Sequence, residues 1–280
     1  MERARPHLGT IVSVRVGRAP DPALAIETAF SAVARVEQLM SCHDPESELS
    51  RLNCSAHLRA LPVDPWTWCV FRLAVLLGRD SAGAFDCAIG ARQVAAGLLP
   101  AHDRDPPAAA EGSSADIDLS QPYRIRYRNK LYVDLGGIAK GFAVDRAVDA
   151  LRLAGAESGV VNAGGDLRAY GAAAETVHVR MPGNGGLRAI GEIREAAVAT
   201  SIAGEETPLS LPILDGANGR RPVARLVSLF ASHCVLADAL TKVVAVRGES
   251  SAPLLARYCA EALLCERDSG IWTRIGAPAC

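Results

Sequence analysis

The segment from Asp134 to Asp145, DLGGIAKGFAVD, combines a carboxylate, two adjacent glycines and a lysine at close spacing. The carboxylate ends an apolar run, Gly136 and Gly137 free the backbone, and Lys140 enters a predicted helix. A helix N-terminus beside a lysine suits a phosphate group. The spacing matches neither GxGxxG nor Walker A, so a strand–turn–helix corner with an incidental lysine remains the alternative.

Three shorter segments carry further polar groups. Gly83–Asp86 has the sequence GAFD, a glycine turn with an aromatic ring and a carboxylate, and Asn162–Asp166 has the sequence NAGGD. The paired glycines of NAGGD allow close backbone approach, although an ordinary turn explains it equally well. Val198–Ser201, with the sequence VATS, places two hydroxyls after a predicted strand.

Asp238 and Thr241 are spaced as residues i and i+3, which lie on one face of a helix. A carboxylate and a hydroxyl in this arrangement can offer hard oxygen ligands to Mg²⁺. The alternative is a helix-capping aspartate followed by a solvated threonine.

Composition excludes several classes of protein. The 280 residues contain 30 basic and 31 acidic side chains, so no positive excess favours nucleic acid. No apolar run approaches the ~20 residues of a membrane helix. Met1–Thr10 contains three charges and no apolar core of a signal peptide, which predicts a cytoplasmic protein, or an exported one if an upstream leader is missing.

The eight cysteines form no CxxC pair, so their spacing does not indicate a zinc site. Cys69, Cys87 and Cys259 lie in apolar stretches, where a reduced thiol packs as a small hydrophobic group. We therefore expect reduced cysteines in a reducing compartment rather than a disulfide framework.

The elements that must position these groups alternate between strand and helix patterns. We expect helices over 22–40, 65–77, 139–153, 237–246 and 252–264, from apolar residues at helical spacing. We expect strands over 8–16, from 160, and near 176–181, 187–194, 224–231 and 271–275, and a hairpin over 123–134 that turns at Asn129–Lys130. This mixture predicts an α+β fold in a single domain over 1–280, possibly of two subdomains, with a loose surface loop at 101–116.

Taken in order, seven segments resemble the FAD:protein FMN transferase (ApbE) family from about Leu8 to Val246. They are LGT at 8–10, the run over 40–53, GAFD, DLGGIAKGFAVDRA, VNAGGDLRAYG, VATS and ADALT. The resemblance implies an ApbE-like fold of mixed, mainly antiparallel sheets flanked by helices. It also implies Mg²⁺-dependent transfer of FMN from FAD to a threonine hydroxyl of an acceptor protein, with release of AMP. Such acceptors are subunits of redox complexes.

The family's site falls on matching residues of this chain. The implied metal ligands are the backbone of Gly137, the carboxylate of Asp238 and the hydroxyl of Thr241. The isoalloxazine ring of FAD would stack on Phe85 or His43. The implied FAD contacts are Leu8, His43, Ala84, Phe85, Asp86, Asp134, Lys140 and Leu214.

Two positions depart from the family pattern. Lys242 stands where the family has a threonine ligand, and Pro212 stands where it has a histidine, which leaves Asp215 and His233 as candidates for moving the acceptor proton. Lys242 can pair with Asp238 or the pyrophosphate, or it can extend to solvent and leave Thr241 as the ligand; we favour the second. An FAD-binding protein without transfer activity and a pyrophosphatase that cuts FAD to FMN and AMP remain alternatives.

Overall fold

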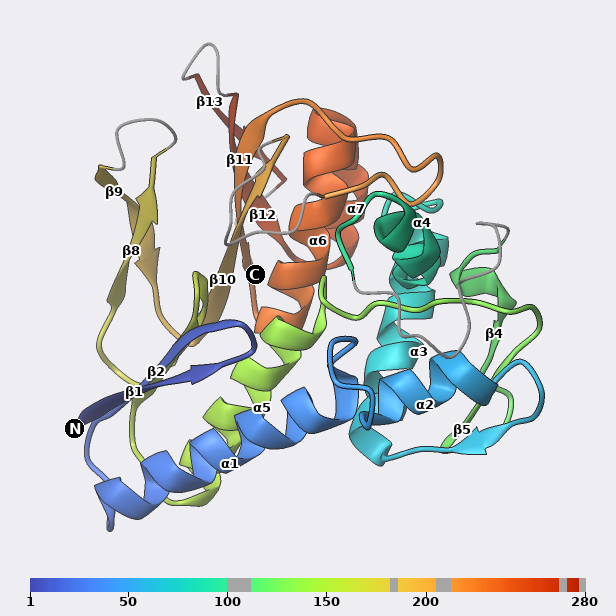
Figure 1. The fold of residues 1–280 in the computed structure, drawn as a ribbon. Coiled ribbons are helices and arrows are strands. Elements are labelled where there is room, and N and C mark those ends of the chain that lie inside the picture. The colour runs from blue at the N-terminus through green and yellow to red at the C-terminus, as the bar shows by residue number, and fades with distance from the viewer. Residues whose placement is uncertain (100–111, 182–185, 205–212, 267–270, 277–280) are drawn as a thin grey trace.

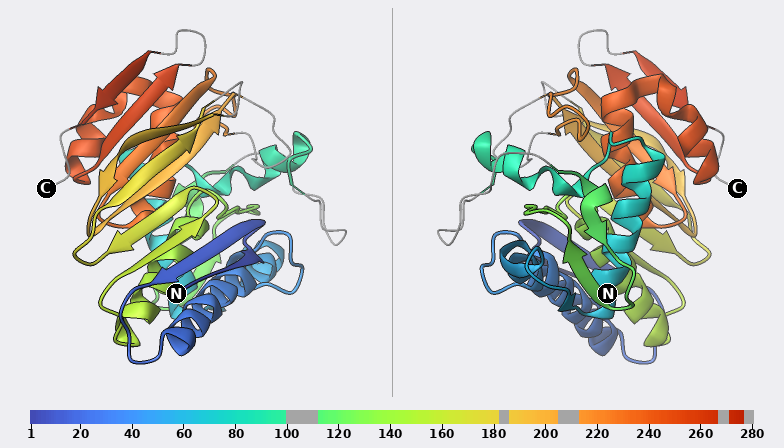
Figure 2. Two further views of the ribbon diagram at one scale, coloured as in Figure 1. Left: turned by 90° about the vertical axis from the view of Figure 1, so that its left-hand side faces the viewer. Right: turned by 90° about the vertical axis from the view of Figure 1, so that its right-hand side faces the viewer.

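An antiparallel sheet runs through the computed structural model, which describes residues 1–99, 112–181, 186–204, 213–266 and 271–276. Eight strands follow one another in the order β1-β2-β6-β7-β10-β11-β12-β13 (Figure 2). All of their pairings are antiparallel. The strands are Glu2–His7 (β1), Thr10–Val16 (β2), Gly159–Ala163 (β6), Asp166–Tyr170 (β7), Ala196–Ala203 (β10), Arg225–Ala231 (β11), Glu261–Glu266 (β12) and Trp272–Ile275 (β13).

Three helices cover one face of this sheet: Pro22–Met40 (α1), Ala139–Leu153 (α5) and Cys234–Arg247 (α6) (Figure 1). Asp21 starts α1 by accepting hydrogen bonds from the amides of Ala23 and Leu24, and Pro22 fits the first turn. The remaining helices are Glu48–Ser55 (α2), Pro65–Asp80 (α3), Gly90–Ala95 (α4) and Ala252–Arg257 (α7), with short 3₁₀ turns at Cys87–Ile89, Ser114–Asp116 and Gly248–Ser251.

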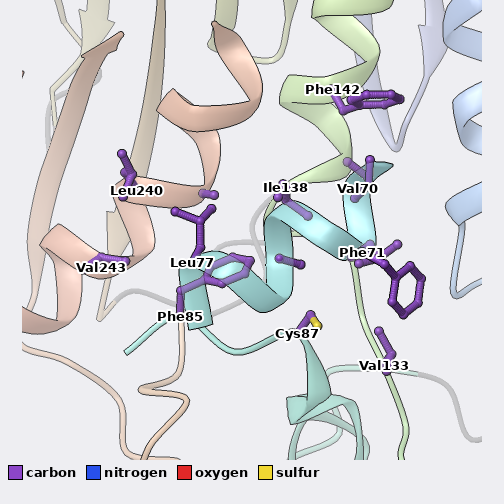
Figure 3. Packing of buried hydrophobic residues seen from close by; sticks show 14 of the residues in the cluster. Val70, Phe71, Leu77, Phe85, Cys87, Val133, Ile138, Phe142, Leu240 and Val243 are labelled. Atoms are coloured by element: carbon purple, nitrogen blue, oxygen red, sulfur yellow. The ribbon is translucent and has the colours of Figure 1, made fainter. Parts of the chain in front are cut away.

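Smaller strand groups complete the fold. Leu61–Pro62 (β3), Arg124–Tyr127 (β5) and Ile117–Asp118 (β4) pair in the order β3-β5-β4, and Glu175–Arg180 (β8) pairs with Leu187–Ile193 (β9). The β8–β9 ribbon packs on the face of the sheet opposite the helices, since its buried side chains contact those of β7 and β10. The largest core lies between α3, α6 and the segments at 84–87 and 131–138 (Figure 3).

The structure confirms the α+β class and corrects three of the expected elements. The hairpin over 123–134 is wrong, because β5 pairs with β3 and β4, and the backbone of Val133 is instead hydrogen-bonded to the side chain of Asn53. The helix over 252–264 ends at Arg257, and β12 follows as a buried inner strand, whose continuous apolar run resembles a helix in sequence. The strand over 8–16 starts at Thr10, since Leu8 and Gly9 form a two-residue turn with φ of 54° and 70°.

The thiols are only partly arranged as expected. Cys87 is buried as expected, but Cys69 and Cys259 are exposed rather than packed as small hydrophobic groups. Most of the loop expected at 101–116 lies outside the described residues. Within the described ranges, no helix combines the length and apolar character needed to cross a membrane.

Helices α5 and α6 approach closely at Gly141. An ideal Cβ built on Gly141 would lie 2.3 Å from the carbonyl oxygen of Cys234 and 2.8 Å from Cβ of Asp238. The close packing of α5 on α6 therefore requires glycine at this position, although glycine is less favourable than alanine inside a helix.

We predict that Gly141→Ala destabilises the protein by about 1–3 kcal/mol, because the methyl group forces α5 and α6 apart. Denaturant unfolding measures the effect. Gly186→Ala is the matched control, since a Cβ there meets no atom within 4 Å. Equal unfolding midpoints for the two variants would contradict the packing argument.

Candidate functional site

Asp134 ties together the corner that precedes α5. Its Oδ1 accepts hydrogen bonds from the amide of Gly136 at 2.9 Å and from Sγ of Cys42 at 3.4 Å, and its Oδ2 accepts one from Nε2 of Gln93 at 3.0 Å. The residue is buried. The carboxylate thus fixes the turn at Gly136 and Gly137, from which α5 starts at Ala139.

Lys140, in the first turn of α5, pairs with the carboxylate of Asp166 at the start of β7. Its Nζ lies 3.2 Å from Oδ2 of Asp166, and its side chain is 36 % exposed. The charge of Asp166 raises the pKa of Lys140, against the effect of burial. Burial, together with the charge of Asp238, raises the pKa of Asp166 to about 6. Lys140 therefore keeps its positive charge in this pair, and its side chain is partly exposed.

Asp238 lies in the middle of this group and is fully buried. Its Oδ2 accepts a hydrogen bond from the amide of Gly141 at 3.0 Å, and its Oδ1 pairs with Nζ of Lys242. Burial alone would raise the pKa of Asp238, but the charges of Lys242 and Lys140 outweigh it, so the pKa is lowered. Asp238 is a carboxylate with both oxygens engaged.

Thr241 turns toward the sheet. Its Oγ1 donates to the carbonyl oxygen of Asp238 at 2.6 Å and lies 2.8 Å from Oγ of Ser201. The two hydroxyls of the VATS segment lie within β10, not after a strand, and alternate between its faces. Ser201 therefore meets α6, while Thr200 pairs with Ser228 at 3.0 Å.

Lys242 points into the site, so the expectation that it extends to solvent is wrong. Besides the ion pair, its Nζ donates to the carbonyl oxygen of Asp238 at 2.9 Å, and its side chain is 18 % exposed. Its stem passes Gly137: an ideal Cβ there would lie 3.6 Å from Cε of Lys242. Residues four apart on a helix share one face, which places this ammonium directly on Asp238.

The residues expected to bind a divalent cation do not fit one in this arrangement. Asp238 is paired with Lys242 and with an amide, Thr241 is hydrogen-bonded to its own helix and to Ser201, and the Lys242 stem lies at Gly137. Within the described residues, no group of three or more His, Cys, Asp or Glu is placed to hold a metal ion. An ammonium occupies the side of Asp238 that a cation would need.

The GAFD segment packs against the segment after Ile213. An ideal Cβ on Gly216 would lie 2.4 Å from the carbonyl oxygen of Gly83 and 2.6 Å from Cβ of Asp86. Asp86 accepts hydrogen bonds from the amides of Ala88 at 2.8 Å and Ser114 at 3.0 Å, while burial raises its pKa. The structure thus places residues 83–86 against Gly216, two residues after Leu214, and the expected FAD contacts at Ala84, Phe85, Asp86 and Leu214 stay predictions.

Phe85 differs from its expected role as a stacking surface. It is only 5 % exposed and lies in the core beside Leu77, near Leu240 and Val243 of α6 (Figure 3). Its ring approaches Gly137, with Cε2 3.6 Å from the position of an ideal Cβ. The ring of Phe85 therefore packs against the glycine turn. Of the two rings expected to stack on the isoalloxazine of FAD, only His43 is exposed.

Leu8 and His43 lie near a second part of the candidate site. Glu37 accepts hydrogen bonds from the amide of Leu8 at 2.8 Å and pairs with Nδ1 of His7 at 2.9 Å. A surface hollow of about 410 Å³ is lined by Glu37, His43, Asp44 and neighbouring residues of α1. The strained turn at Leu8 is thereby held beside an open hollow.

The two candidate proton acceptors lie in other surroundings. Asp215 is in a turn, where it accepts hydrogen bonds from the amide of Ala217 and the side chain of Asn218. His233 precedes α6 and is hydrogen-bonded to Ser232 at 3.0 Å; burial and the charge of Arg168 lower its pKa. Neither side chain makes a described contact with Lys140 or Asp238, and Pro212 lies outside the described residues.

Asp145, which sequence reasoning did not select, anchors α6 to α5. Its carboxylate accepts hydrogen bonds from the amides of Cys234 and Val235, both at 2.9 Å, and from Nη1 of Arg168 at 2.7 Å. The ion pair is almost completely buried. Asp145 is the last residue of the DLGGIAKGFAVD motif, and Asp166 is the last residue of NAGGD. The motifs therefore contained both carboxylates, but only the fold shows that they pair with Arg168 and Lys140.

The fold thus brings two ammonium groups, Lys140 and Lys242, and two carboxylates, Asp166 and Asp238, together at the start of α5. The model of the ApbE family matches residues 8–264, and the chain belongs to this family. It is 28 % identical over 294 residues to the FAD:protein FMN transferase of Treponema pallidum, covering 91 % of this chain and 81 % of that protein. It is 27 % identical to the FAD:protein FMN transferase of Vibrio cholerae, covering 87 % and 80 %.

Solved structures have the same fold. The flavin transferase ApbE from Vibrio cholerae superposes with a TM-score of 0.82 at 23 % identity, covering 98 % of this chain and 96 % of that one. The flavinyl transferase ApbE from Pseudomonas stutzeri, in its apo form, superposes with a TM-score of 0.82 at 20 % identity, covering 98 % and 93 %. At these identities the likeness establishes the fold.

We predict that Asp145→Asn destabilises the protein by about 3–5 kcal/mol, because it leaves the buried Arg168 without its counter-charge. Thermal or denaturant unfolding measures the loss. Asp149→Asn is the matched control on the same helix, since Asp149 forms a partly exposed pair with Arg146 that contributes about 1 kcal/mol or less. Similar losses in both variants would show that Asp145 is not the anchor.

Proposed function

We propose that this chain transfers FMN from FAD to a hydroxyl group of an acceptor protein and releases AMP. The observation that carries the proposal is the pair of ammonium groups, Lys140 and Lys242, at the start of α5 and against Asp238. Two positive charges beside a helix N-terminus suit the pyrophosphate of FAD. Membership of the ApbE family, with relatives named FAD:protein FMN transferase, supports the same reaction.

Each group of residues has a place in the proposed complex. Lys140, in the first turn of α5, holds the pyrophosphate, and Asp134 fixes the glycine turn from which this helix starts. The hollow beside His43 offers room for one end of FAD. Such phosphoryl transfer depends mainly on positioning and on stabilising charge.

The acceptor is proposed to be a threonine of a redox-complex subunit, as the family resemblance implies. In the step, the threonine oxygen bonds to the FMN-side phosphorus, and the bond from that phosphorus to the bridging oxygen breaks. AMP leaves with the bridging oxygen and its electron pair, and the hydroxyl proton is released to water. That Asp215 or His233 assists this proton release stays a prediction. The Mg²⁺ requirement implied by the family resemblance and the cytoplasmic location also stay predictions.

A second candidate is an FAD-binding protein without transfer activity. The Lys242–Asp238 pair favours it, because it engages the carboxylate that the family resemblance assigns to a metal. Hydrolysis of FAD to FMN and AMP is a third candidate activity, which the experiment below distinguishes from the other two.

We predict that incubation with FAD and an acceptor protein containing the target threonine gives a covalently flavinylated acceptor and AMP. Fluorescent gel bands and intact mass measure the product. Replacing that threonine with valine is the control, and it should abolish labelling. Free FMN without an acceptor would indicate a pyrophosphatase, and tight FAD binding without either product would indicate a binding protein.

We predict that Lys140→Met weakens FAD binding by about 10- to 150-fold, since a charge-assisted contact contributes about 1.5–3 kcal/mol. Methionine keeps the length of the side chain, and Lys130→Met controls for the lost charge. Flavin fluorescence titration measures Kd. Unchanged affinity in a folded Lys140→Met protein would exclude Lys140 from the binding site.

A further inference from the structure

Lys242 brings a fixed positive charge to the one fully buried carboxylate on α6 among the described residues. Its Nζ contacts both Oδ1 and the carbonyl oxygen of Asp238, and its stem lies against Gly137. These are the positions from which the family resemblance implies a bound metal. The side chain as a whole remains 18 % exposed.

The charges of the site already balance without a metal ion. Lys140 and Lys242 contribute two positive charges, and Asp166 and Asp238 contribute two negative ones. A divalent cation at Asp238 would have to displace the ammonium or lie beside it, and in a partly buried site such repulsion is weakly screened. Charge therefore opposes a metal at this carboxylate.

The remaining candidate ligands are committed as well. The hydroxyl of Thr241 donates to its own helix and is also bonded to Ser201, which directs it to the sheet instead of to the open side of Asp238. Both oxygens of Asp238 have donors. A metal at Asp238 would therefore have to break the ion pair with Lys242 and compete with the donors already on both oxygens.

We propose that the ammonium of Lys242 replaces the divalent cation, so that this chain handles the phosphates of its ligand without a metal. Two of its three hydrogens are used on Asp238, which leaves one for a phosphate oxygen. Its contribution to transfer rests on the proposed function. There it offsets the negative charge on the FMN-side phosphate while the acceptor oxygen bonds and AMP leaves, and no further reactant is required.

The first experiment measures metal binding and does not depend on transfer. Mn²⁺ is titrated into the parent, Lys242→Thr and Lys130→Thr proteins with FAD present, and free Mn²⁺ is followed by electron paramagnetic resonance. We expect Lys242→Thr to bind Mn²⁺ at least about tenfold more tightly than the parent, because removing the ammonium frees a carboxylate. Lys130→Thr loses the same charge elsewhere and should behave as the parent. Equal Mn²⁺ affinity of parent and Lys242→Thr would overturn the proposal.

The second experiment measures FMN transfer to the acceptor in excess EDTA and in excess Mg²⁺. We expect the parent to keep its rate in EDTA within about twofold and Lys242→Thr to require Mg²⁺, because each cation neutralises the same phosphate charge. Lys242→Met, which has neither charge nor ligand, should lose transfer in both buffers. A parent that is inactive in EDTA and restored by Mg²⁺ would overturn the proposal. A parent inactive in both buffers would contradict the proposed function, and the Mn²⁺ titration would still decide the role of Lys242.

Discussion

The contact between α5 and α6 at Gly141 is the constraint on which the rest of the site depends. Because Gly141 has no side chain, the two helices come close enough for its amide to reach the carboxylate of Asp238. The carboxylate of Asp145, one turn further along α5, accepts hydrogen bonds from the first two amides of α6. Together these contacts fix where Asp238 and Lys242 lie relative to Lys140, so a packing requirement sets the geometry of a charged cluster.

Buried charge is tolerated here because each carboxylate has a nearby cation from another part of the chain or from the next helical turn. Asp166 has Lys140, Asp238 has Lys242, and Asp145 has Arg168. Burial of ions costs more than their attraction returns unless the geometry is good and the remaining oxygens are hydrogen-bonded. The amide donors at Asp238 and Asp145 meet that condition. Such a cluster therefore selects one arrangement of the elements instead of adding much stability.

Local patterns predicted the helices α1, α3 and α5 and the strands β2, β5, β6, β8, β9, β11 and β13, because helical spacing, alternation and caps such as Asp21 act over short range. They failed for the hairpin over 123–134 and for β12, where pairing partners distant in sequence decide the structure. The motifs located Asp134, Lys140 and Asp238, since those residues stand beside glycines or on a helix face. The direction of the Lys242 side chain was predicted wrongly: the spacing of four residues allows a pair with Asp238, but the contact of the lysine stem with Gly137 is seen only in the fold.

The Asp145 carboxylate also bears on how the molecule moves. It joins α5, β7 and α6 in one buried junction, so separating α5 from β7 breaks a buried ion pair and separating α6 removes two amide donors from the carboxylate. Such elements exchange their amide hydrogens as one cooperative unit and only in rare, near-global openings. The hollow beside His43 lies outside this junction, at the irregular segment between α1 and α2. In the proposed complex, the phosphates of FAD would thus bind beside the junction, whereas the other end would meet a segment that the junction does not hold.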